Sequence, residues 1–143
     1  MRELVLVLIS LLPFAGSYML ERQMTTTGVM PPFLSLATLF LLAWGFAAWA
    51  AVRLGMTGRR VLLCLHLVPT LDLVLLAVQE LILRRYWMSW LGVWSQLYYL
   101  PLVNMAARLT RWSGRLFMTY VTAFLMLLAA AWLGTRLGTR HRE

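Results

Sequence analysis

The stretch Val61–Leu83 constrains the fold of this chain more than any other part of the sequence. Its 23 residues are apolar enough to cross a membrane, because about 20 helical residues span the hydrocarbon core of a bilayer. The stretch nevertheless carries strongly polar side chains at His66, Asp72, Gln79 and Glu80. An ionised carboxylate at the bilayer centre costs roughly 2.5–3.5 kcal/mol, so we expect Asp72 to face other helices or a water-filled cavity.

The polar residues of this stretch share one half of a helix surface. Successive residues are 100° apart on an α-helix, which places Asp72 and Gln79 on one line, with His66 and Glu80 on the same half. The other half is apolar and consists of Leu63, Cys64, Leu67, Val68, Leu71, Val74, Leu75, Val78, Leu81 and Ile82. The pattern predicts a helix whose apolar half faces lipid and whose polar half faces protein.

The composition extends this interpretation to the whole chain. Of its 143 residues, 62% are apolar and 13% are charged, against about 25% charged in soluble domains. The net charge is +8, but the arginines lie between apolar segments, so we expect lipid headgroups as their partners and no nucleic acid. The single cysteine, Cys64, excludes an internal disulfide and a Cys-x-x-Cys site.

Four further apolar segments accompany the central one. The expected spans are residues 4–20, 33–52, 61–83, 86–107 and 116–133, followed by a basic tail at 134–143. The sequence therefore predicts a single all-α domain, a polytopic integral membrane protein of about five short transmembrane helices in a bundle. The tail contains glycines and no apolar stripe, so we expect it to be frayed and dispensable for folding.

The first segment is the weakest candidate for a span. Its 17 residues reach only about 25 Å as a helix, and Pro13 and Gly16 interrupt it. The segment favours a short or kinked span, and a re-entrant or interfacial helix is the alternative. It can also be interpreted as a signal peptide with a small-residue cleavage site at Ala15–Ser17.

Small residues in the second segment indicate a helix-packing surface. Ala43, Ala47 and Ala51 recur every four residues, a spacing that lets another helix approach closely. Arginine and aromatic residues mark the membrane–water interfaces at the ends of the later segments. These expected interface anchors are Arg84, Arg85, Tyr86, Trp87, Trp90 and Trp112.

The third and fourth segments are predicted to form a tight helical hairpin. With its turn between Arg84 and Arg85, Asp72 and Gln96 lie at the same depth, about 18 Å from that interface. His66 and Asn104 are matched in the same way. The resulting candidate polar site comprises His66, Asp72, Gln79, Glu80, Gln96 and Asn104. Its side chains either join helices by hydrogen bonds or form a functional site.

Several chemistries have no support in the sequence. His66 is the only histidine within a predicted span, which excludes a bis-histidine haem within one chain. There is no His-Glu-x-x-His, Gly-x-Ser-x-Gly or Gly-rich phosphate motif. We therefore name no catalytic residue, no metal ligand and no cofactor.

The layout of the chain resembles that of one known family. Five apolar segments, Pro31-Pro32 before the second segment, seven tryptophans and a basic tail are similar to the layout of the tryptophan-rich TspO sensory proteins. The aromatic motifs of that family around its prolines and in its third helix are missing here. The resemblance therefore implies the helical layout alone, with no residue or ligand carried over.

The sequence supports two main functional hypotheses and is compatible with a third. The first is a non-enzymatic subunit or accessory factor of a larger membrane complex. The second is a small oligomeric transporter, channel or proton-handling protein that uses the polar face of the third helix, and the third is binding of lipid or a small apolar ligand between helices. We expect a prokaryotic cytoplasmic membrane, protein partners within it and a cytoplasmic N-terminus, although the arginines are nearly balanced between the two sides.

Overall fold

The structure is a computed structural model that describes residues 2–85 and 90–140, and this part of the chain is helical without any strand. The helices are joined by short turns. They are α1 (Arg2–Thr27), α2 (Phe33–Arg53), α3 (Gly58–Ala77), the π-helical segment η1 (Val78–Ile82), α4 (Trp90–Leu97), α5 (Leu100–Leu109) and α6 (Leu116–Arg140).

Within the described residues, four helices are long and apolar enough to cross a membrane. They are α1 with 26 residues, α2 with 21, the continuous α3–η1 helix Gly58–Ile82 with 25, and α6 with 25. Each exceeds the roughly 20 residues that a spanning helix needs. The all-helical fold and the membrane location predicted from the sequence agree with these helices.

The first span is longer than the predicted residues 4–20. Helix α1 passes through Pro13 and continues along the polar residues to Thr27. The hydroxyls of Thr25, Thr26 and Thr27 each donate to a carbonyl one turn earlier, so these polar side chains are satisfied within the helix. The helix ends where Gly28 adopts a φ of 65°, a conformation that glycine adopts without strain.

The predicted fourth span, residues 86–107, is not a single helix. It contains α4, with 8 residues, and α5, with 10, separated by a turn at Tyr98 and Tyr99. Pro101 explains the break, because it has no N–H to donate to Leu97 and its ring clashes with that carbonyl. The described residues thus contain four helices of spanning length where the sequence predicted five.

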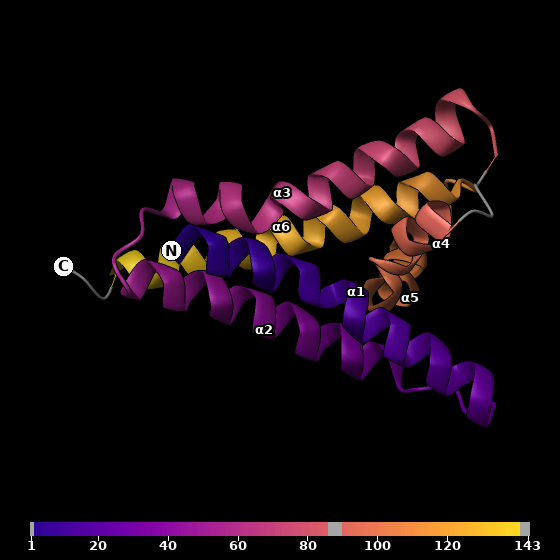
Figure 1. The fold of residues 1–143 in the computed structure, drawn as a ribbon, viewed down its shortest axis with the longest axis horizontal. Helices are drawn as coiled ribbons and strands as arrows, with labels where there is room; N and C mark the ends of the chain where they lie inside the picture. The colour runs from indigo at the N-terminus through magenta and orange to yellow at the C-terminus, as the bar shows by residue number, and fades with distance from the viewer. Residues whose placement is uncertain (1, 86–89, 141–143) are drawn as a thin grey trace.

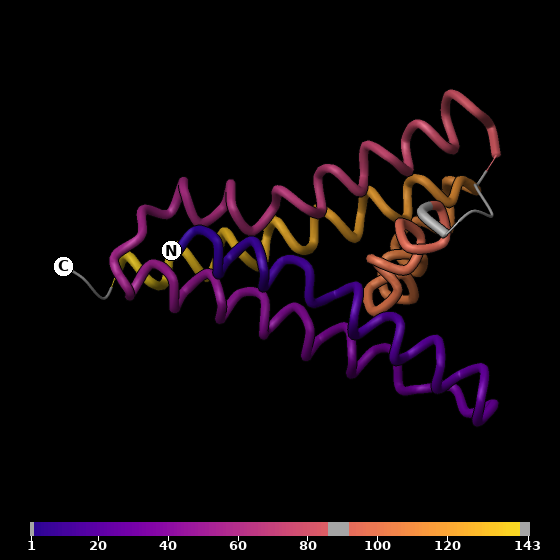
Figure 2. The backbone as a smooth tube through the Cα atoms, in the orientation of Figure 1, coloured from indigo at the N-terminus to yellow at the C-terminus, as the bar shows by residue number. Residues whose placement is uncertain are grey.

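Among the long helices, α1 packs on α3, α3 packs on α6, and α2 packs on α6 and more sparsely on α3. Figure 1 shows that the pair α1 and α2 diverges from the pair α3 and α6 toward one end, where α4 and α5 lie between them. The tube in Figure 2 shows the start of α1 and the end of α6 toward the opposite end of the molecule. Helix α5 contacts both α2 and α6, and α4 contacts α3 and α1.

The most extensive helix contact is that of α2 with α6, and glycines allow it. A Cβ at Gly134 would overlap the carbonyl oxygen of Gly45, and one at Gly138 would lie 2.9 Å from Cβ of Val52. A Cβ at Gly45 would lie 3.1 Å from the carbonyl oxygen of Ala130. The two backbones therefore meet along a spacing of small residues typical of membrane helices.

This contact differs from the packing surface predicted from the alanine repeat. Ala43 is exposed and Ala47 is half-buried, and both border an apolar groove between α1 and α2. Ala51 is buried, but the residues of α2 nearest the α6 glycines are Gly45, Ala48, Trp49 and Val52. The contact with α6 therefore uses a neighbouring line of α2, and approach of another helix along the alanine line stays a prediction.

The predicted basic tail is instead the end of α6, which continues through Arg140. Gly134, Thr135 and Gly138 are buried there, against α2 and the start of α3. Because these residues are buried, we no longer expect the residues after Leu133 to be dispensable for folding. Truncation after Leu133 is now expected to lower the melting temperature of the protein in detergent, since it removes about two turns of the α2–α6 contact.

We predict that Gly134→Ala destabilises the protein by about 1–3 kcal/mol, because the new methyl group forces α6 away from the Gly45 carbonyl. The matched control is Gly16→Ala in α1, where a Cβ would meet no atom within 4 Å. The control should be neutral or stabilising by up to about 1 kcal/mol, as alanine is the better helix former. Thermal unfolding of both variants in detergent tests this, and equal melting temperatures would contradict the close contact.

Candidate functional site

A buried line of polar and apolar residues runs along the inner face of α3 and η1. It consists of His66, Pro69, Asp72, Leu76 and Gln79. The opposite face is exposed at Leu63, Leu67, Leu71 and Val74. The polar groups on this face therefore meet other helices, which makes this the candidate site.

Asp72 lies at the centre of this face and is only 7% exposed. Its Oδ2 atom is buried and has no hydrogen-bond partner among the described residues. Asp72 is near enough to Tyr98, Tyr99 and Tyr120 to interact electrostatically with all three phenols. A buried carboxyl group thus lies within electrostatic range of three phenols from two other parts of the chain.

The tyrosine hydroxyls donate to backbone carbonyls of the long helices. Tyr98 donates to the carbonyl of Ser10 in α1 at 2.9 Å, and Tyr99 donates to the carbonyl of Pro69 in α3 at 2.7 Å. Both side chains are fully buried and their rings meet edge to face with centroids 5.0 Å apart. The turn between α4 and α5 is therefore held between α1 and α3, close to Asp72.

Gln79 connects η1 to α4. Its Nε2 donates to Oγ of Ser95 at 3.0 Å, and that hydroxyl donates to the carbonyl of Gly92 at 2.8 Å. Gln79 lies in a π-helical turn, a rare geometry that is frequent at functional sites. This chain of buried bonds fixes α4 against the end of the third span.

His66 occupies a separate aromatic environment on the same face. Its ring meets Trp44 and Phe124 edge to face, with centroids 6.2 Å and 5.8 Å away. Its Nδ1 atom lies 3.1 Å from the carbonyl of Leu62, which satisfies that nitrogen within α3. Its Nε2 atom is buried and has no hydrogen-bond partner in the described part of the chain.

The remaining candidate residues are less enclosed. Glu80 and Gln96 are half-buried, and Asn104 is exposed on α5. The expected pairs Asp72–Gln96 and His66–Asn104 do not occur as hydrogen bonds between these described residues. The matched depth of His66 and Asn104 assumed one straight fourth helix, and the break before Pro101 removes that register. Gln96 lies before the break, in α4, where its neighbour Ser95 is the residue that binds the third span through Gln79.

The expected interface anchors divide into described and undescribed residues. Arg84 and Arg85 are exposed just after η1, and Trp112 is 78% exposed between α5 and α6. Tyr86 and Trp87 lie outside the described residues, as does the side chain of Trp90 at the start of α4.

Sequence reasoning missed four members of the site. Tyr98, Tyr99, Tyr120 and Ser95 were not predicted as site residues, because a tyrosine or serine in an apolar helix is common. A signal was available in Tyr98-Tyr99 directly before Leu100-Pro101, where a helix break exposes backbone groups that hydroxyls can bind.

The described side chains contain no group of three histidine, cysteine, aspartate or glutamate residues that could hold a metal ion. In its described residues, the protein is all-helical, with four helices of spanning length and a buried aspartate within electrostatic range of three tyrosines. Comparison with protein-family models, curated proteins and solved structures gives no match.

We predict that Tyr99→Phe destabilises the protein by about 1 kcal/mol, because the Pro69 carbonyl loses its buried donor. Tyr18→Phe is the matched control, since Tyr18 is exposed and stacks on Trp94 through its ring. The control should change stability by less than about 0.5 kcal/mol. If denaturation in detergent gives the same loss for both, the hydroxyl does not hold the turn.

Proposed function

We propose that this chain is a small integral membrane protein that binds a proton or a monovalent cation at Asp72 and passes it through the membrane. The observation that carries the proposal is the buried Oδ2 atom of Asp72, which lacks a hydrogen-bond partner among the described residues. An unsatisfied buried polar group costs about 1–3 kcal/mol, so a purely structural carboxyl would be expected to have a partner. Ionisable residues that are present inside spans despite this cost commonly mark ion or proton pathways.

Helix irregularities around Asp72 support the same proposal. Pro69 interrupts the α3 hydrogen bonds one turn before Asp72, and η1 begins six residues after it. The break at Tyr98 and Tyr99 lies on the facing element. Of these, the α4–α5 break is a discontinuity of the kind found in many transporter binding sites, where unwound turns present backbone carbonyls.

The proposal includes a membrane arrangement. In it, α1, α2, α3–η1 and α6 cross the bilayer as a bundle, and α4 with α5 takes the place of the fifth span as an element that enters and leaves on one side. Four helices enclose little interior, so neighbouring copies would complete the path. The N-terminus is cytoplasmic in a prokaryotic membrane, and the end of α6 lies on the same side.

We predict that Asp72→Asn abolishes proton or cation flux while leaving the fold intact. Asparagine keeps the shape of the side chain, but it cannot exchange a proton or supply a negative charge. Flux is measured with purified protein in liposomes, and stability by melting in detergent. Glu21→Gln, the same acid-to-amide change at the end of α1, is the control and should retain the wild-type flux.

Two results would contradict this proposal. Wild-type protein that gives no more flux than protein-free liposomes would rule out transport by the isolated chain. An Asp72→Asn variant with normal flux would show that the carboxyl is not on the path. The Asp72→Leu variant distinguishes a structural role of the carboxyl from a role in transport. It should lower the stability of the protein by about 1–2 kcal/mol only if the carboxyl joins helices.

A second candidate is an accessory subunit of a larger membrane complex. The specific observation that favours it is an apolar groove of about 430 Å³ between α1 and α2, bordered by Ala43 and Ala47. Small residues on an outward line of a span suit the approach of another helix. Stoichiometric larger proteins that co-purify from native membranes in mild detergent, and are lost with Ala47→Leu, would favour this candidate over transport.

A further inference from the structure

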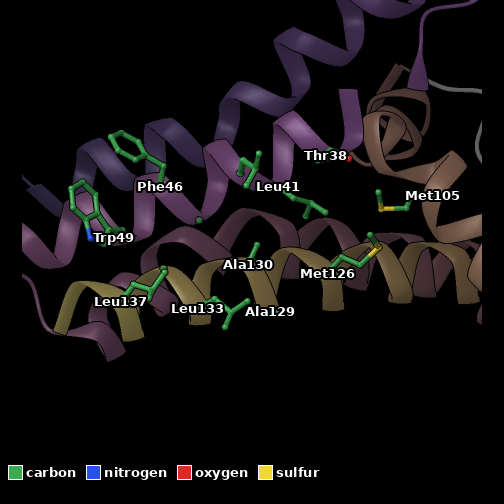
Figure 3. Close-up of a pocket in the computed structure, with 13 residues that line it drawn as sticks. Thr38, Leu41, Phe46, Trp49, Met105, Met126, Ala129, Ala130, Leu133 and Leu137 are labelled. Atoms are coloured by element: carbon green, nitrogen blue, oxygen red, sulfur yellow. The ribbon is translucent and has the colours of Figure 1, made fainter. Parts of the chain in front are cut away.

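An apolar groove of about 800 Å³ follows the contact of α2 with α6 (Figure 3). At the bottom of the groove, where the two backbones meet, lie the small residues Gly45, Ala130 and Gly134. Their lack of large side chains makes the groove deep. Phe46 and Trp49 on α2 line one side, and Leu133 and Leu137 on α6 line the other. Met105 of α5 and Met126 lie at its inner end.

The length of the groove corresponds to one leaflet of a bilayer. On α2 its lining extends from Thr38 to Trp49, and on α6 from Met126 to Leu137. Eleven residues of helix rise about 16 Å, and half of a hydrocarbon core of about 30 Å is about 15 Å. An acyl chain that enters at Trp49 and Leu137 would therefore end near the two methionines, which are adaptable packing residues.

Two arginines lie just beyond the outer end of the groove, one on each of the two helices that line it. Arg53 lies one turn after Trp49, with its guanidinium 5.9 Å from the centre of that ring. Arg140 follows Leu133 by seven residues, so the two side chains leave α6 in nearly the same direction. Both arginines are exposed. Positive charge therefore adjoins the groove at the depth where a lipid headgroup would lie.

We propose that this groove is a binding site for an anionic phospholipid, with one acyl chain in the groove and the phosphate between Arg53 and Arg140. The apolar lining explains how the groove binds an acyl chain, but it does not select a lipid headgroup. Selection comes from the guanidinium groups, which bind phosphate oxygens with paired, charge-assisted hydrogen bonds. The lipid site does not include Asp72, so lipid binding and the proposed transport can be tested separately.

Native mass spectrometry of the full chain in mild detergent tests the headgroup. The protein is mixed with equal amounts of phosphatidylglycerol and phosphatidylcholine that have the same acyl chains. We expect about a tenfold preference for phosphatidylglycerol, given the attraction of two arginines near the surface. The double variant Arg53→Gln/Arg140→Gln should lose it, whereas Arg111→Gln/Arg115→Gln, the same charge change between α5 and α6, should keep it.

A second pair of variants tests the groove itself. Ala129 lines the groove and is exposed, so Ala129→Phe should fill it and reduce binding of both lipids at least fivefold. Ala15→Phe places the same ring on an exposed position of α1 and should leave binding unchanged.

Three outcomes would overturn the proposal. The first is a wild-type protein without headgroup preference, and the second is an equal loss in the two arginine double variants, which would indicate general attraction of lipid to a basic protein. The third is unchanged lipid binding in Ala129→Phe together with loss of a dimer, which would assign the groove to a second copy of the chain.

Discussion

The rest of the structure depends on the close approach of α2 and α6. Apolar side chains gain little from meeting each other in lipid, since lipid tails are as apolar as leucine, so membrane helices associate where their backbones can come near. Gly134 and Gly138 allow this against Gly45 and Val52. The contact fixes the pair on which α5 packs, and it shapes the apolar groove along the same line.

A second constraint concerns the backbone at the α4–α5 turn. Irregular backbone at membrane depth is tolerated only where protein surrounds it or water reaches it, because lipid offers no hydrogen bonds. Tyr98 and Tyr99 are fully buried at this turn and bind carbonyls of α1 and α3. The same two side chains lie within electrostatic range of Asp72, and Tyr99 binds the carbonyl of Pro69 on the same face of α3, so the break that Pro101 causes adjoins the candidate site.

Much of the third helix could be predicted from the sequence, and its neighbours could not. The polar half of Val61–Leu83 indicated which side chains turn inward, and the structure buries His66, Asp72 and Gln79. The partners depended on an assumed straight fourth helix. The break before Pro101 separates Asn104 from the register of the preceding helix, and Asn104 lies at the surface. In α4, before the break, Ser95 rather than Gln96 binds the third helix, through Gln79.

By itself, the sequence determined the helical class, the apolar segments and the lipid-facing side of the third helix, because these follow from local composition and a period of 3.6 residues. Only the tertiary structure decided that α6 extends through Arg140, that Gly45 rather than Ala47 meets it, and that Tyr98 and Tyr99 bind carbonyls of α1 and α3. The physical reason is that each of these depends on distances between helices. A repeat of small residues shows that a close approach is possible, and the neighbouring helix determines where it occurs.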